Sequence, residues 1–172
     1  MKSEILFRKA KKEDALQLSI LFKQVYMKTY AVEGITHEFA NFVSQKFSVE
    51  AIKNTIEKEN SMIVATYKDN PVGVAEIVYD STCPIRNIVS PELGKLYVLD
   101  WFFGKGIGNG LIASVETELK NKGHNEYWLW VYIKNNRAIS FYEKQQFVVI
   151  GNAFFDMEMH SYENKVMQKV IT

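Results

Sequence analysis

The 172-residue chain is predicted to fold as an α/β domain, with a mixed and mostly antiparallel sheet of about seven strands and helices on both faces. Three observations predict this class. Some segments have apolar residues at helical spacing, others are β-branched and aromatic runs, and the two kinds follow each other as in proteins whose helices pack on a sheet. The sequence has no repeat, low-complexity tract or Pro/Gly/Ser-rich linker. Residues 1–172 are therefore predicted to form a single domain.

Strands and helices are predicted from these two patterns. The β-branched and aromatic runs are the strand candidates, at 5–10, 61–67, 71–79, 93–102, 126–132, 147–151 and 165–171. The helical pattern covers 14–28, about 36–59, about 106–123 and about 135–145. The segment EYWLWVY (126–132) is apolar on both faces, which predicts a strand in the middle of a covered sheet. The predicted order is β-α-α-β-β-β-α-β-α-β-β.

Capping and turn residues support several of these boundaries. Ser48 is an N-cap candidate within the second helical region, with Glu50 in the positive first turn. The sequence KDNP (68–71) is a good tight connection between two strands. Gly123 is a natural C-terminal stop, and Asn135 is predicted to cap the last helix.

Composition and charge exclude several classes of protein. The formal net charge is +1, with 21 basic and 20 acidic side chains, which excludes a globally basic nucleic-acid-binding protein. No apolar run approaches the roughly 20 residues that a membrane-spanning helix needs. The N-terminal segment lacks the apolar core of a signal peptide. We therefore expect a cytoplasmic protein without nucleic-acid or membrane partners.

Metal and thiol chemistry are not expected either. His37, His124 and His160 lie far apart and match no zinc-ligand spacing. Cys83 is the only cysteine, which precludes an intrachain disulfide. It precedes Pro84 in a predicted loop, and the sequence shows no neighbouring base or helix N-terminus that would activate the thiol. We expect no bound metal and no catalytic role for this cysteine.

The stretch 103-FGKGIGNGL-111 places four of the nine glycines between a predicted strand and a predicted helix. The first N–H groups of a helix lack internal partners and form the positive end of the helix dipole, so a flexible loop before them can hold phosphate. Glycine permits unusual dihedral angles and lets anionic oxygens approach the backbone. The spacing fits neither the dinucleotide-binding nor the Walker pattern. The alternative is that these glycines serve only the tight packing of strand and helix.

Two segments resemble the GCN5-related N-acetyltransferase (GNAT) family, 96-LYVLDWFFGKGIGNGLI-112 and 135-NNRAISFYEKQQF-147. The predicted order of strands and helices is also that family's, so the resemblance extends over most of the chain. The segments YAVEGITHEF (30–39) and FSVEAIKNTIEKENS (47–61) look most like the bacterial spermidine/spermine acetyltransferase branch. The resemblance implies an acetyl-CoA-dependent N-acetyltransferase in which a primary amine, such as that of a polyamine, attacks the thioester directly. The family is often dimeric, so a homodimer is a candidate assembly, although the sequence does not give the oligomeric state.

The resemblance assigns residues to the cosubstrate acetyl-CoA. In the family the strand supplies backbone contacts to pantetheine, the following loop binds the pyrophosphate, and a later helix carries an Asn…Ala…Phe-Tyr-Glu-Lys signature. The basic side chains at these positions would pair with the 3′-phosphate and pyrophosphate, and the asparagine with pantetheine amides. The matching acetyl-CoA-binding candidates are Leu96, Tyr97, Val98, Phe103, Gly104, Lys105, Gly106, Ile107, Gly108, Asn135, Arg137, Ala138, Tyr142 and Lys144.

The chemistry of acetyl transfer makes three demands on the protein. The resemblance implies that the backbone around Val98 stabilises the oxygen of the tetrahedral intermediate. Tyr142 is the candidate to give a proton or a hydrogen bond to the departing thiolate, because it lies two helical turns after Asn135 on nearly the same face. Glu76 and Asp100 are candidates to take the acceptor's proton, directly or through water. The alternatives are a packed aromatic residue for the tyrosine and solvated surface carboxylates for the two acids.

Two positions depart from the family pattern. Phe103 stands where the family has Arg or Gln, which removes one side-chain contact near the pyrophosphate, and Gln146 stands where it has Gly. Both departures motivate a second hypothesis, a CoA-binding module that has lost turnover. A protein N-terminus or an aminoglycoside is an alternative acceptor, and the two failed glycine patterns disfavour a nucleotide-binding domain.

Overall fold

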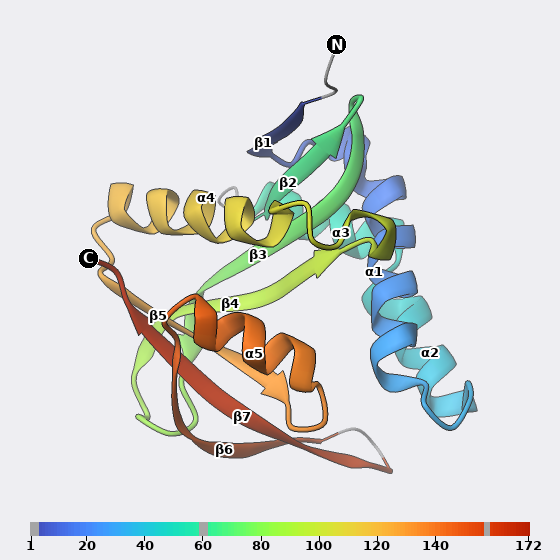
Figure 1. Ribbon diagram of the computed structural model, residues 1–172. Helices are drawn as coiled ribbons and strands as arrows, with labels where there is room; N and C mark the ends of the chain where they lie inside the picture. Colours follow the sequence, from blue (N-terminus) through green and yellow to red (C-terminus); the bar gives the residue numbers. More distant parts are fainter. Residues whose placement is uncertain (1–3, 59–61, 157–158) are drawn as a thin grey trace. The chain divides into compact units, whose positions relative to one another are not determined.

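The computed structural model describes residues 4–58, 62–156 and 159–172 (Figure 1). In this part of the chain seven strands and five α-helices follow one another. Their bounds are β1 (Ile5–Lys9), α1 (Ala15–Tyr30), α2 (His37–Lys46), α3 (Val49–Glu57), β2 (Met62–Tyr67), β3 (Asn70–Thr82), β4 (Val89–Val98), α4 (Ile107–Asn121), β5 (Glu126–Tyr132), α5 (Asn136–Lys144), β6 (Val148–Asp156) and β7 (Ser161–Val170). Short 3-10 turns cover Lys12–Asp14 and Asp100–Phe102.

The strands form a mixed sheet in the order β1-β2-β3-β4-β5-β7-β6. The pairs β1–β2, β2–β3, β5–β7 and β6–β7 are antiparallel, and the pair β4–β5 is parallel. A parallel pair needs a crossover connection, and α4 provides it between β4 and β5. The predicted fold class, an α/β protein with a mixed and mostly antiparallel sheet of seven strands, is confirmed.

The chain divides into two compact units. The first runs up to Glu76 and includes Lys95–Val115, and the second comprises Ile77–Gly94 and Glu116–Thr172. Strands β3 and β4 and helix α4 each contribute to both units.

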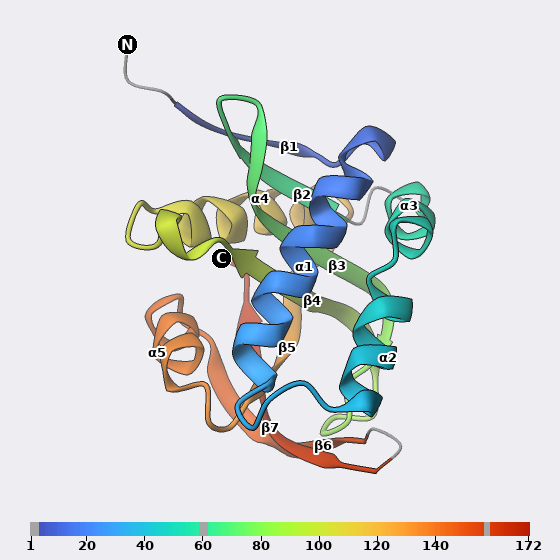
Figure 2. The same ribbon diagram turned by 90° about the vertical axis from the view of Figure 1, so that its right-hand side faces the viewer.

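In the first unit, helices cover both faces of the strands (Figure 2). Gly73 of β3 faces α4, since a Cβ at this position would lie 3.1 Å from Cγ2 of Ile107. Glu76 lies three positions further along the same strand and therefore on the opposite face. On that face Phe22 of α1 packs edge-on against Tyr97 of β4, with ring centroids 5.5 Å apart. Helices α1–α3 and the start of α4 thus bury the two sides of β2, β3 and β4.

In the second unit, β5 is the central strand, as its sequence predicted. Strand β5 pairs with β4 on one side and with β7 on the other, and Tyr127, Trp128 and Leu129 are at most 2% exposed. Successive side chains along β5 enter different clusters. Tyr127 contacts the ring of Phe147, whereas Trp128 packs with Cys83, Val166 and partly buried neighbours. Cys83 is therefore a core residue.

Three sequence predictions needed correction. The region 36–59 contains two helices instead of one: Thr36 caps α2, and Ser48 caps α3 by accepting a hydrogen bond from the Ala51 N–H at 3.2 Å. Because an N-cap residue has extended dihedral angles, a helix cannot continue through it. The end of that region at 59 and the start of the strand at 61 lie outside the described residues.

The other two corrections concern strand lengths. Strand β4 begins at Val89 and stops at Val98, because the chain turns at Asp100–Phe102 where a strand was predicted. Strands β6 and β7 are longer than the runs 147–151 and 165–171, since they extend as a hairpin whose outer residues are polar or exposed. The exposed Phe154 and Phe155 stand among polar residues, so this part of the hairpin shows no alternation of apolar and polar residues.

Candidate active site

The glycine loop between β4 and α4 has the backbone conformation that glycine favours. Gly104 and Gly106 have φ angles of +73° and +77°, in the left-handed region. A Cβ at either position would meet no atom within 4 Å, so the space around both residues is open. These two glycines are therefore required by the conformation of the loop and not by packing.

Gly110, in the same stretch, has a different role. A Cβ at this position would lie 2.1 Å from Cζ of Phe7, the aromatic residue of β1 that covers the first turn of α4. The packing alternative is therefore right for Gly110. Gly73 of β3 makes a similar close approach to α4, with Ile107 and Leu111 within 3.3 Å of an added Cβ.

Helix α4 begins immediately after the loop. The Gly106 carbonyl accepts a hydrogen bond from the Gly110 N–H at 3.0 Å, which makes Gly106 the residue before the first turn. The N–H groups of Ile107 and Gly108 belong to that first turn, where a helix has no internal acceptors and a positive dipole end. Lys105 is exposed, with Nζ 4.7 Å from the ring centroid of Phe102. The loop and helix start together fit an anionic group such as a diphosphate.

Phe103 at the head of the loop is 36% exposed, and its N–H donates to the Asp100 carbonyl at 3.0 Å. The Asp100 carboxylate forms an ion pair with Lys28 of α1. This aspartate is therefore paired, while its side chain remains 33% exposed. The Lys28 ammonium also lies 5.9 Å from the ring centroid of Phe103.

The last residues of β4 precede this loop. Leu96, Tyr97 and Val98 are half-buried, and the chain is tied to β3 just after them by the Leu99 N–H, which donates to the Val72 carbonyl at 2.9 Å. The side chain of Tyr97 packs against Phe22, so this residue presents its ring to α1.

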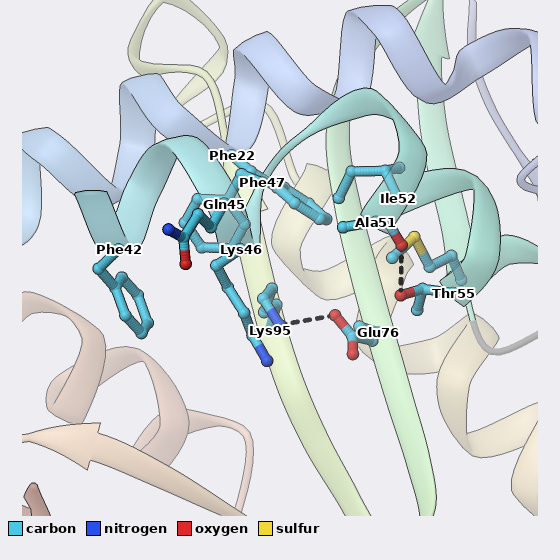
Figure 3. A pocket seen from close by; sticks show the side chains of 11 residues that line it. Phe22, Phe42, Gln45, Lys46, Phe47, Ala51, Ile52, Thr55, Glu76 and Lys95 are labelled. Atoms are coloured by element: carbon cyan, nitrogen blue, oxygen red, sulfur yellow. Dashed lines mark hydrogen bonds and ion pairs between the residues drawn. The ribbon is translucent and has the colours of Figure 1, made fainter. Parts of the chain in front are cut away.

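A cavity of about 470 Å³ lies on the α1 face of β3 and β4 (Figure 3). Its lining combines aromatic and aliphatic side chains with a few polar groups: Phe22, Phe42, Gln45, Lys46, Phe47, Ala51, Ile52, Thr55, Met62, Glu76 and Lys95. Glu76 is only 8% exposed and accepts a hydrogen bond from Nζ of Lys95 at 2.7 Å. The sequence candidate Glu76 is thus a buried, ion-paired carboxylate in a cavity, and the solvated-surface alternative for it is wrong.

Helix α5 of the second unit carries the other sequence candidates. Asn135 caps this helix, with Oδ1 accepting from the Ala138 N–H at 3.2 Å. Tyr142 is 8% exposed, and its ring lies 5.5 Å from that of Phe147. Arg137 and Lys144 are exposed. The predicted cap is confirmed. Tyr142 packs against an aromatic neighbour, and its catalytic role stays a prediction.

A buried network that the sequence did not reveal lies beside this helix. The Tyr127 hydroxyl donates to Glu116 at 2.9 Å, and Lys169 forms an ion pair with the same carboxylate at 2.5 Å. Burial and the neighbouring Glu116 carboxylate raise the pKa of Tyr127 well above its usual value, so this hydroxyl stays protonated. The three residues come from β5, α4 and β7, and nothing in their spacing brings them together in the sequence.

Gln146 occupies a turn that usually requires glycine. Its φ angle is +69°, and the Phe147 N–H donates to the Tyr142 carbonyl while the Gln146 N–H donates to that of Glu143. These two hydrogen bonds form a Schellman motif at the end of α5. The same motif ends α4, where Gly123 has a φ angle of +81°. The departure from glycine at Gln146 therefore preserves the turn.

A family model described as an acetyltransferase (GNAT) domain matches residues 26–161. The chain belongs to the GNAT acetyltransferase family. The resemblance inferred from the glycine loop and the last helix is confirmed, and this GNAT enzyme is an acyltransferase that uses acetyl-CoA as its cosubstrate.

The GNAT chain is similar to several known proteins. It is 30% identical to a spermidine N(1)-acetyltransferase of Thermoplasma acidophilum over 84% of this chain and 89% of that protein. It is 28% identical to an uncharacterized N-acetyltransferase of Mycobacterium tuberculosis, over 74% of this chain and 76% of that protein. Among solved structures, PaiA N-acetyltransferase of Thermoplasma acidophilum, in complex with coenzyme A, superposes with a TM-score of 0.74 at 25% identity, covering 97% and 99% of the two chains.

No helix in 4–58, 62–156 or 159–172 is long and apolar enough to cross a membrane. Within the same ranges no group of three or more His, Cys, Asp or Glu side chains is arranged to hold a metal ion.

Proposed function

We propose that this GNAT enzyme acetylates a primary amine of a small polyamine such as spermidine. The observation that carries the proposal is the cavity beside β3, in which the Glu76 carboxylate pairs with the ammonium group of Lys95 beside the rings of Phe22 and Phe47. A carboxylate with aromatic walls is a suitable environment for an alkylammonium ion. The 30% identity to a spermidine N(1)-acetyltransferase supports the same class of acceptor.

Acetyl-CoA binding is assigned to the backbone of the glycine loop and to the residues of the family motif. The amides of Gly104–Gly108 hold the pyrophosphate, aided by Lys105, because the open left-handed backbone there leaves room for phosphate oxygens. The backbone of Leu96–Val98 and the amide group of Asn135 bind pantetheine. Phe103, Ile107 and Ala138 contribute main-chain contacts, and Arg137 and Lys144 pair with the phosphates.

Acetyl transfer then requires three contributions from the protein. Acetyl-CoA supplies the activated acetyl group as a thioester. The main-chain N–H near Val98 stabilises the negative charge that develops on the thioester oxygen. Tyr142 gives a proton or a hydrogen bond to the thiolate that leaves. Glu76 takes the proton of the acceptor amine, directly or through water, which frees the nitrogen lone pair for attack.

The alternative of a CoA-binding module without turnover has weak structural support. Gln146, one of the two departures that motivated it, keeps the left-handed turn that a glycine would adopt. The other departure, Phe103, removes a side chain only, whereas the backbone of the adjacent loop retains its open conformation.

An assay of product formation tests the proposal. The enzyme is incubated with acetyl-CoA and, separately, with spermidine, spermine, lysine, an aminoglycoside and a short peptide, and free CoA and acetylated amine are measured. We expect the highest kcat/KM with a polyamine. A higher kcat/KM with the aminoglycoside or the peptide would show that the acceptor belongs to that class and is not a polyamine. Binding of acetyl-CoA without CoA release in the presence of any amine would establish the inactive module instead.

The single-domain organisation of residues 1–172 and the homodimer remain proposals.

A further inference from the structure

We propose that Lys95 occupies, with its own ammonium group, the site that receives the ammonium of the acceptor amine, and that Lys95 must leave this site when the acceptor binds. The inference rests on the proposed function for the identity of the acceptor. It makes Lys95 a residue that sets the affinity for amines.

The contacts of Lys95 are those expected of a bound alkylammonium. Its Nζ lies 2.7 Å from Oε2 of Glu76 and 5.9 Å from the ring centroids of both Phe22 and Phe47. The side chains of Lys95 and Glu76 are 16% and 11% exposed, so the ammonium is largely removed from water. One carboxylate and two aromatic rings from three different parts of the fold therefore lie near a single cation, and Figure 3 shows the Glu76 carboxylate facing Lys95.

The surroundings of the pair distinguish it from a purely structural ion pair. A cavity of about 470 Å³ adjoins it, and Phe42, Ile52 and Met62 add apolar walls suited to the methylene chain of an amine. Lys46, which is exposed, is the other charged side chain among the described residues that line this cavity. Water screens its charge, so Lys46 repels a cation in the cavity less strongly than the buried Glu76 carboxylate attracts it.

The second unit contains an ion pair of closely similar geometry. Lys169 lies 2.5 Å from Glu116 and 5.9 Å from the ring centroid of Phe147, and the two side chains are 12% and 20% exposed. Neither residue lines the cavity beside Glu76. Removing the charge of Lys169 therefore changes the net charge and breaks a comparable pair without opening the proposed site.

The exchange of one ammonium for another has a simple energetic consequence. Glu76 and the two rings interact with a cation both when Lys95 fills the site and when the acceptor ammonium fills it. The ammonium of Lys95 therefore competes with the acceptor. If Lys95 fills the site about nine-tenths of the time, the apparent dissociation constant of the acceptor is raised about tenfold. The freed Lys95 can extend toward water on its flexible stem while the apolar part stays packed.

Calorimetric titration with spermidine, in the absence of acetyl-CoA, tests the inference. We expect Lys95→Met to bind spermidine about five- to tenfold more tightly than the wild type, and Lys169→Met to stay within about twofold. Adding Glu76→Gln to Lys95→Met should abolish the gain. Unchanged or weaker binding by Lys95→Met, or an equal gain in Lys169→Met, would overturn the inference.

A measurement on the wild type tests the displacement of Lys95 by spermidine even if the Lys95→Met variant fails to fold. Lysines labelled with ¹³C at Cε are observed by NMR, where the rings of Phe22 and Phe47 shift the Lys95 signal. On addition of spermidine this signal should move to the position of exposed lysines, whereas the Lys169 signal should stay in place. An unmoved Lys95 signal at saturating spermidine would contradict the exchange. Neither readout involves acetyl transfer, so exchange without acetylation of spermidine would refute the proposed function alone.

Discussion

The ring of Phe7 fills the space that a side chain at Gly110 would need, since a Cβ there would lie 2.1 Å from Cζ of Phe7. Gly104 and Gly106, six and four residues earlier, have open space instead and left-handed backbone angles. One glycine-rich stretch therefore serves two physical needs, close packing of β1 on α4 and an unusual loop conformation. The two needs predict different consequences of substitution.

Gly110→Ala is expected to lower the free energy of unfolding by about 1–3 kcal/mol, because the added methyl group overpacks a contact between two regular elements. Urea denaturation of the variant and the wild type measures this difference. Phe7→Leu combined with Gly110→Ala should recover part of the loss, since the smaller side chain makes room. An unchanged unfolding midpoint in Gly110→Ala would show that Phe7 moves aside at no cost.

Tyr142→Phe is expected to lower kcat while the affinity for acetyl-CoA stays within about threefold, because only the hydroxyl that serves the leaving thiolate is removed. The ring contacts with Phe141 and Phe147 are kept, so the fold should be unaffected. Steady-state kinetics and acetyl-CoA titration measure the two effects. A variant with the turnover of the wild type would exclude Tyr142 from the mechanism and leave it as a packed core residue.

Gln146→Gly is expected to raise the free energy of unfolding by about 1 kcal/mol, because a residue with a Cβ is strained at a φ of +69°. The reciprocal change Gly123→Gln places the same side chain in the same motif at the end of α4 and should destabilise by a similar amount. Thermal unfolding of both variants checks the pair. Equal thermal unfolding midpoints for the wild type and Gln146→Gly would mean that contacts of the Gln146 side chain offset the backbone strain at its positive φ.

The ion pair between Arg8 and Asp14 should give the stability a pH dependence. Hydrogen bonds from the Arg8 guanidinium, at 2.7 and 2.9 Å, lower the pKa of Asp14 below its ordinary value. A carboxyl whose pKa is lower in the folded state stabilises the fold at pH values above its unfolded pKa, about 3.9, and loses this contribution as the pH falls through the folded pKa. The difference in unfolding free energy between the wild type and Asp14→Asn should therefore be constant from pH 5 to 7 and shrink at lower pH. A difference independent of pH down to about 2 would contradict this account.

Local signals made most of the fold predictable. Ser48, Gly123 and Asn135 mark helix ends through their own backbone and side-chain chemistry, and each acts as predicted. The apolar character of both faces of EYWLWVY identified the central strand of the second unit. These features depend on residues close together in the sequence, where spacing alone carries the information.

The features that were missed depend on contacts between distant residues. Whether Gly110 serves packing depends on Phe7, about a hundred positions earlier, and the Glu76–Lys95 pair depends on the register of two strands. Strand β4 stops at Val98, where Leu99 is hydrogen-bonded to Val72 of β3 and Asp100 of the following turn is paired with Lys28 of α1. Charged and aromatic residues at such positions look the same in the sequence whether they are solvated or paired.

We propose that the amides of the glycine loop hold the diphosphate of acetyl-CoA. Calorimetric titration of acetyl-CoA into Gly106→Val tests it, with Gly34→Val as the matched control. Gly34 also has a left-handed φ, +100°, and open space around it, but lies in the loop before α2. We predict that the first variant loses measurable acetyl-CoA binding and that the second retains the affinity of the wild type. Wild-type affinity in a folded Gly106→Val would contradict the claim.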